Sequence, residues 1–180
     1  MSIYGVRRRV ACYVTRTTEG GRELLVFDHV DDDPDDPSGV QIPAGGMLPF
    51  EGIEDAALRE TEEETGLTGL TFAAQLGGHE RGMNDPGGPS MTTYVHLQAS
   101  DGGPDAWTHT VTSQATAGSS APDPSADAAG ATALSAQDSV AAEHADDGMV
   151  SACRWEPLPL SVELAGDQAK FLENLAGPDG

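Results

Sequence analysis

The chain has 180 residues, a length that suits a single domain. Its 30 Asp and Glu residues outnumber its nine Lys and Arg residues, and the formal net charge at pH 7 is −21. A surface this acidic would repel nucleic-acid polymers and anionic membranes, so we expect neither as a partner, whereas a bound metal ion can still attract a small anion.

Cysteine content and apolar segments indicate the compartment. Cys12 and Cys153 cannot form a disulfide framework, and both lie in apolar, strand-like segments, so we expect them to be buried. The apolar run 10–14 is too short for a signal peptide, and no stretch approaches the roughly 20 apolar residues of a membrane span. We therefore expect a soluble, cytoplasmic protein.

Two strands are predicted at the start of the chain, over 6–15 and 23–30. The Asp- and Pro-rich segment 31–39 that follows is typical of an exposed loop. It does not fit a calcium-binding loop, because Asp36 stands where such a loop needs Gly and Ile42 where it needs Glu.

A short strand over 40–43 and a helix over 53–65 are predicted next. Acidic residues at the start of this helix favour its positive end, and Gly66 fits a left-handed cap at its other end. On the helix, Glu60, Glu63 and Glu64 share one face, because residues three and four apart are neighbours. Such glutamates are often simply solvated, but their mutual repulsion is also relieved by a divalent cation such as Mg²⁺ or Mn²⁺.

The flanking residues make the second interpretation specific. The segment 45–67 resembles the Nudix box, the signature of hydrolases that act on a nucleoside diphosphate linked to another group. The chain supplies these residues of that pattern in register: Gly45, Glu51, Arg59, Glu60, Glu63, Glu64, Gly66 and Leu67. It departs from the pattern at Thr61, where an apolar residue is usual, and at Phe50, where many members have Gly.

The resemblance implies an α/β protein with the Nudix fold, in which a mixed sheet lies between helices (α/β/α). It also implies hydrolysis of a phosphoanhydride with Mg²⁺, or Mn²⁺, as cofactor. The residues it assigns to catalysis are Arg59, Glu60, Glu63 and Glu64. The three glutamates are also the expected metal ligands, together with the backbone carbonyl of Ala44.

Individual roles in the box differ. Glu60 is expected either to bind the metal or to act as the base, since the family takes its base from the box in some members and from a distant loop in others. Arg59 is expected to hold a box carboxylate through its guanidinium group. Gly45, Glu51 and Gly66 are expected to be structural, with Glu51 supporting the loop or the arginine.

Beyond the box, strands are predicted over 70–76, 91–99 and 149–160, and a helix over 161–175. The Gly-rich loop 77–90 is a candidate substrate-binding loop. Between 113 and 148 the chain is almost wholly Ala, Ser, Asp, Gly, Thr and Pro, which predicts a disordered insertion. Residues 1–112 and 149–180 are then expected to form one Nudix domain.

Several further residues are candidates for the site, each with an alternative. Arg7, Arg9 and Arg81 are expected to bind substrate phosphates, although they could instead offset nearby carboxylates. His79 and His109 could act on the substrate or form ordinary hydrogen bonds. Trp107 and Tyr94 could stack on a base or belong to the core. The candidates for a metal carboxylate outside the box are Glu80, Asp101 and Glu143.

The leading hypothesis is a Mg²⁺-dependent Nudix pyrophosphohydrolase that acts on a small nucleotide-diphosphate substrate. The alternative is a Nudix-fold nucleotide-binding or regulatory module without significant hydrolysis. Nucleotide sugars, ADP-ribose, dinucleoside polyphosphates and oxidised nucleoside triphosphates all remain open as substrates. A homodimer is expected by analogy only.

Overall fold

The computed structural model describes residues 5–35, 37–100, 103–112 and 148–175. The segment predicted to be a disordered insertion, 113–148, lies outside the described residues except for Gly148. Within the described residues, no helix is both long and apolar enough to span a membrane.

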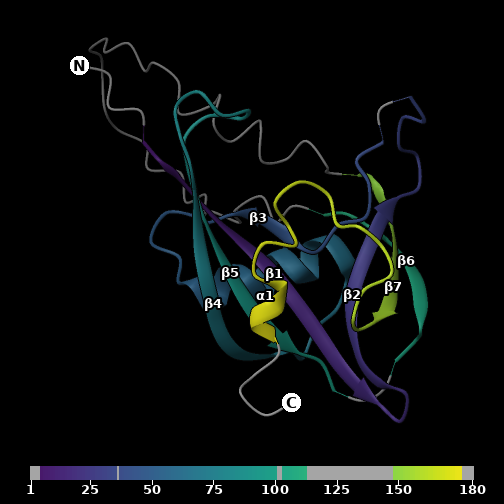
Figure 1. The fold of residues 1–180 in the computed structure, drawn as a ribbon. Coiled ribbons are helices and arrows are strands. Elements are labelled where there is room, and N and C mark those ends of the chain that lie inside the picture. Colours follow the sequence, from purple (N-terminus) through teal and green to yellow (C-terminus); the bar gives the residue numbers. More distant parts are fainter. Residues whose placement is uncertain (1–4, 36, 101–102, 113–147, 176–180) are drawn as a thin grey trace, which may run out of the picture.

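A mixed sheet of seven strands forms the middle of the molecule (Figure 1). Its strands are β1 (Arg7–Thr18), β2 (Gly21–His29), β3 (Ala44–Gly46), β4 (Thr71–Arg81), β5 (Ser90–Gln98), β6 (Ala106–Thr110) and β7 (Val150–Pro157). They lie in the order β4-β5-β1-β2-β7-β6, and β3 pairs with β1 beside β2. The pair β1 and β5 is parallel, whereas the other pairs are antiparallel.

Strand β1 is central because its side chains alternate between two apolar cores. Val10, Cys12 and Val14 are buried in one cluster, together with residues of the helix α1 (Ile53–Thr65). Ala11 and Tyr13 are buried in a second cluster on the opposite face of the sheet. Each face of the sheet must therefore be covered by another segment of the chain.

Helix α1 covers the first face and has the bounds that its sequence predicts. Glu54 and Asp55 lie in its first turn, and Gly66 ends it in the left-handed conformation with φ 72°. The Gly66 N–H donates to the Glu62 carbonyl at 2.8 Å, which satisfies one of the free carbonyls at the end of the helix.

The C-terminal segment, residues 161–175, covers the second face, on the opposite side of β1 from α1 (Figure 1). The helix predicted over 161–175 is wrong: this segment is a series of turns that ends in the short 3₁₀ helix η1 (Leu172–Leu175). Gly166 interrupts it with φ 55°, and the Ala165 N–H donates to the Val40 carbonyl instead of to a helical turn. The layered arrangement expected of the sheet is confirmed, with irregular chain in place of the second long helix.

The strand bounds differ from the predicted ones where pairing with distant residues decides them. Strand β4 continues to Arg81 because it pairs with β5 along its length, so residues 77–81 are not part of a loop. Strand β6, which was not predicted, pairs with β7. Cys12 and Cys153 are both buried, as expected.

Gly77 tests the packing of the C-terminal segment on the sheet. A Cβ atom at Gly77 would lie 2.3 Å from Cε1 of Phe171, whereas one at Gly78 would meet nothing closer than 3.5 Å. We expect Gly77→Ala to lower the free energy of unfolding by about 1–3 kcal/mol through this overlap. Gly78→Ala, on the other face of the same strand, should change it by less than about 1 kcal/mol. Equal effects of the two changes in denaturant titrations would refute this packing.

Candidate functional site

The centre of the predicted box is Arg59, which links the loop before α1 to the helix itself. Its guanidinium group donates to both oxygens of Glu51, from Nε at 2.7 Å and from Nη2 at 2.9 Å. Nη2 also donates to the Gly46 carbonyl at 2.8 Å. Nη1 donates to Glu60 Oε1 at 2.8 Å and to Glu63 Oε2 at 3.0 Å. Arg59 thus holds three box carboxylates at once.

These hydrogen bonds fix the charge states of the partners. The Arg59 guanidinium keeps the pKa of Glu51 below its ordinary value, because it stabilises the ionised carboxylate. Glu51 in turn raises the pKa of Arg59 above its ordinary value. Glu51 Oε2 also accepts from the Leu48 N–H at 2.8 Å, so the carboxylate supports both the loop and the arginine.

Glu60 and Glu63 are buried carboxylates, exposed by only 8% and 7%. The pKa of Glu60 is raised to about 7, chiefly because burial disfavours its ionised form; the charge of Glu63 acts in the same direction and Arg59 in the opposite one. The Arg59 guanidinium therefore does not fully offset the burial of this carboxylate. A carboxylate in this state favours a nearby cation.

Glu64 contacts the strand β3 on the other side of the box. Its Oε2 accepts from the Ala44 N–H at 2.9 Å. The next residue, Gly45, must lack a side chain, because a Cβ atom there would lie 2.0 Å from Glu60 Oε2. Gly66 is likewise constrained, both by its left-handed backbone and by His109, whose Nδ1 would lie 2.7 Å from a Cβ atom.

The box carboxylates do not all point to one common position. Within the described residues, no three or more His, Cys, Asp or Glu side chains are arranged to hold a metal ion as they stand. Glu60 and Glu63 both contact Arg59, whereas Glu64 turns to Ala44. The donor set still fits a hard divalent cation, because carboxylate oxygens are the ligands that such ions prefer.

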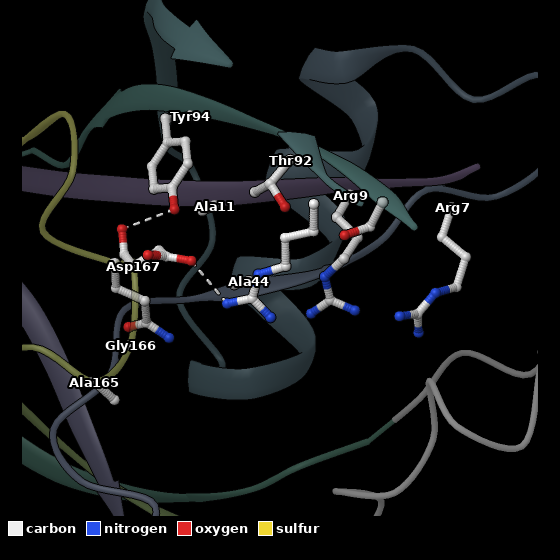
Figure 2. A pocket seen from close by; sticks show the side chains of 12 residues that line it. Arg7, Arg9, Ala11, Ala44, Thr92, Tyr94, Ala165, Gly166 and Asp167 are labelled. Atoms are coloured by element: carbon white, nitrogen blue, oxygen red, sulfur yellow. Dashed lines mark hydrogen bonds and ion pairs between the residues drawn. The ribbon is translucent and has the colours of Figure 1, made fainter. Parts of the chain in front are cut away.

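A cavity of about 300 Å³ adjoins the box and brings together Arg7, Arg9 and Arg81. Arg7 and Arg9 come from β1 and Arg81 from β4, and residues 165–168 of the C-terminal segment also line the cavity. In Figure 2, Arg7 and Asp167 lie at opposite ends of this cavity, with Arg9 between them. We call it the arginine pocket. Ala44, whose N–H contacts Glu64, also lines it.

Asp167 is the acidic member of the arginine pocket, and it was not among the predicted site residues. Its Oδ2 lies 2.9 Å from Arg81 Nη2 and 3.2 Å from His79 Nε2. The Arg81 guanidinium holds the pKa of Asp167 below its ordinary value. The Tyr94 hydroxyl donates to the Asp167 carbonyl at 2.9 Å (Figure 2). The sequence feature that could have pointed to this region is Gly166, because glycine is a poor residue for the interior of the helix predicted there.

The other candidate residues that the structure describes lie at the end of α1, in the arginine pocket or on the surface of β4. His109 Nε2 lies 3.1 Å from the Glu63 carbonyl, and Trp107 Nε1 donates to the Thr65 carbonyl at 2.7 Å, so both residues support the end of α1. Tyr94 lines the arginine pocket and also packs in the second core cluster. Glu80 is exposed on β4, whereas Asp101 and Glu143 lie outside the described residues.

Comparison with known proteins identifies the family. The family model described as the NUDIX domain matches residues 5–175, which is nearly the whole chain. The chain belongs to the NUDIX family. No curated protein shows significant similarity to it.

Solved structures of NUDIX proteins share the fold. The NUDIX domain of Shewanella oneidensis NrtR, solved with ADP ribose, is 16% identical with a TM-score of 0.56, over 97% of this chain and 88% of that one. The Ap4A hydrolase of C. elegans is 23% identical with a TM-score of 0.43, over 54% of this chain and 70% of that one. The family match and the similarity to the NrtR NUDIX domain confirm the Nudix fold expected from the box.

The two departures from the NUDIX pattern have different consequences. Thr61 is fully buried, and its hydroxyl donates to the Ala57 carbonyl at 2.8 Å, so the helix accommodates its polar group. Phe50 has φ 66°, a left-handed conformation that glycine adopts without strain. Its side chain is fully exposed and gains no packing energy in exchange.

Phe50 therefore carries backbone strain that glycine would remove. We expect Phe50→Gly to raise the free energy of unfolding by about 0.5–1 kcal/mol, measured by denaturant titration. Phe50→Ala is the matched control, because it removes the ring but keeps the Cβ atom that disfavours this conformation. A gain of equal size with alanine would mean that the ring, and not the backbone, is responsible.

Proposed function

We propose that the chain is a hydrolase that cleaves the pyrophosphate linkage of a nucleoside diphosphate joined to another group, with Mg²⁺ as its cofactor. The observation that carries the proposal is that Arg59 gathers Glu51, Glu60 and Glu63 of the box, while a pocket lined by three arginines reaches Ala44, the residue before the box. Membership of the NUDIX family and the retained glutamates support it.

Several residues of the box would bind the cation together. Glu60, Glu63 and Glu64 would hold Mg²⁺ (or Mn²⁺) with the Ala44 carbonyl, and the ion would neutralise phosphoryl charge and acidify a bound water. Arg59 keeps Glu60 and Glu63 oriented toward the end of β3. Without the ion, the pKa of Glu60 is raised to about 7, and a bound cation would lower it and keep this carboxylate ionised.

The arginine pocket supplies the cationic contacts that a diphosphate needs. Lys170 is the only lysine among nine basic residues, so the chain has eight arginines, and half of them lie in the box or the pocket. This concentration is unexpected in so acidic a protein unless the region receives an anion. Of the three arginines in the pocket, Arg9 is the one whose charge acts on the box, where it lowers the pKa of Glu60.

A binding or regulatory module that does not hydrolyse its ligand is the competing function. Such a module would need the arginine pocket but not three box carboxylates, of which two are buried at a cost in desolvation. The retained glutamates therefore favour hydrolysis. Homodimer formation stays a prediction.

The first test replaces single carboxylates of α1. With Mg²⁺ and a panel of nucleotides, we expect Glu63→Gln and Glu64→Gln each to lower kcat at least about a hundredfold, because they manage charge in the transition state. Glu62→Gln is the matched control, since Glu62 is exposed on the same helix. EDTA should abolish turnover by the unmodified protein. Full activity of the Glu63 and Glu64 variants would refute the site.

The second test concerns the arginine pocket. We expect Arg9→Gln to raise KM about tenfold, since it removes one charge-assisted contact to phosphate. Arg8→Gln is the control, because neighbouring residues of a strand point to opposite faces and Arg8 is exposed. Steady-state kinetics with the best substrate of the panel would measure both. Equal KM values for the two variants would remove Arg9 from the binding site.

A further inference from the structure

Two tyrosine hydroxyls hold the part of the arginine pocket that comes from the C-terminal segment. The Tyr13 hydroxyl donates to the Gln168 carbonyl at 2.6 Å. The Tyr94 hydroxyl donates to the carbonyl of the preceding residue, Asp167, at 2.9 Å (Figure 2). Both carbonyls therefore belong to residues that line the arginine pocket. The two tyrosines come from the neighbouring strands β1 and β5 and lie on the same face of the sheet.

The burial of the two tyrosines gives these hydrogen bonds their importance. Tyr13 is 0% exposed and Tyr94 is 3% exposed, so neither hydroxyl can turn to bulk water for a partner. Burial also raises the pKa of both hydroxyls above the ordinary value for tyrosine, and both therefore stay protonated and act as donors. The two rings contact each other with their centroids 5.9 Å apart.

The C-terminal segment is attached to the rest of the chain at further points around Tyr13. The Phe171 N–H donates to the Tyr13 hydroxyl at 3.1 Å, so this one hydroxyl bonds to the segment twice. Gln168 Oε1 accepts from the Ile42 N–H at 2.7 Å. These bonds to distant residues take the place of the long helix that would otherwise have fixed the backbone of the segment, and they decide where its residues lie.

The position of Asp167 in turn affects a cation of the arginine pocket. Asp167 Oδ2 lies 2.9 Å from Arg81 Nη2, and the Arg81 side chain is 40% exposed. A long side chain at that exposure has many rotamers unless a fixed partner holds it. An arginine that is already held loses less conformational entropy when it binds a phosphate. Through Asp167, the hydroxyl of Tyr94 thus helps to orient Arg81.

Tyr13 is the residue that separates positioning from direct contact. Tyr94 lines the arginine pocket and could also touch a ligand, whereas Tyr13 is not among the described residues that line it. Any effect of the Tyr13 hydroxyl on ligand binding must therefore pass through Gln168 and its neighbours in the C-terminal segment.

We propose that Tyr13 and Tyr94 are positioning residues of the arginine pocket, whose hydroxyls hold residues 167–168, and with them Arg81, in the arrangement that receives a phosphate group. This inference rests on the proposed function and extends it to two residues outside the box. It makes the attachment of the C-terminal segment a condition for tight binding of the diphosphate, while the chemistry of the box is independent of it.

Replacing Tyr13 with Phe tests the inference, because this change removes the hydroxyl and keeps the ring. We expect Tyr13→Phe to raise KM about fivefold and to change kcat by less than about twofold, since the box is untouched. The dissociation constant for inorganic pyrophosphate with Mg²⁺, measured by calorimetry, should rise about fivefold as well. Tyr94→Phe should act in the same direction and serves as a second variant.

Hydrogen exchange gives a readout of the attachment itself. The Ala165 and Lys170 amides donate to the carbonyls of Val40 and Asp167. In Tyr13→Phe we expect both amides to exchange at least about tenfold faster, because the segment opens more often when one of its anchors is lost.

Thr15→Val is the matched control for the loss of a buried hydroxyl. Thr15 lies two residues after Tyr13 on the same face of β1, is 3% exposed, and its hydroxyl lies 2.8 Å from His96 Nε2. It is absent from the described lining of the arginine pocket. We expect Thr15→Val to lower the denaturant midpoint as Tyr13→Phe does, and to leave KM, pyrophosphate binding and the exchange of the two amides unchanged.

The outcomes separate this inference from the proposed function. Unchanged KM and pyrophosphate binding in Tyr13→Phe and Tyr94→Phe would overturn the positioning role, even if the unmodified protein hydrolyses a nucleotide. Equal losses of binding in Tyr13→Phe and Thr15→Val would also overturn it, because the effect would then follow from stability alone. Pyrophosphate binding that depends on the Tyr13 hydroxyl, without turnover of any nucleotide by the unmodified protein, would instead overturn the proposed function.

Discussion

The arrangement of the site depends on the hydrogen bonds made by the guanidinium group of Arg59. This one side chain binds Glu51 and Gly46 in the loop and Glu60 and Glu63 on the helix, so it fixes the loop and the helix relative to each other. A planar guanidinium group with five donors can make such a set of contacts, whereas a lysine could not. Without it, two buried carboxylates would repel each other with only the weaker effect of Arg9 to oppose the repulsion.

The second constraint is the alternation of side chains along β1. Its residues pack alternately against α1 and against the C-terminal segment, and Arg7 and Arg9 continue the second of these faces beyond the core. Strand β3 pairs with β1 at Arg9 to Ala11 and presents the Ala44 N–H to Glu64. A short length of the paired strands β1 and β3 therefore joins the box carboxylates to the arginine pocket.

This arrangement also explains how a chain of net charge −21 can receive an anionic ligand. Local potential depends on the nearest charges, and the arginine pocket gathers three of the few cations on one wall.

The sequence alone determined the features that depend on neighbours in the chain. The bounds of α1, the left-handed cap at Gly66 and the shared face of the glutamates all follow from hydrogen bonds and spacings within a few residues. The match to the box also predicted that Arg59 would hold a box carboxylate and that Glu51 would support the loop or the arginine, and Glu51 contacts both.

Only the tertiary structure decided the features that depend on distant partners. The segment 161–175 has a helical apolar stripe, yet its backbone bonds to Val40 and the ring of Phe171 packs on the sheet. Strand β4 extends to Arg81 because β5 pairs with it, and Asp167 joins Arg81 across 86 positions of the chain. Periodicity within a segment cannot show these contacts, because their energy comes from surfaces that meet only after the chain has folded.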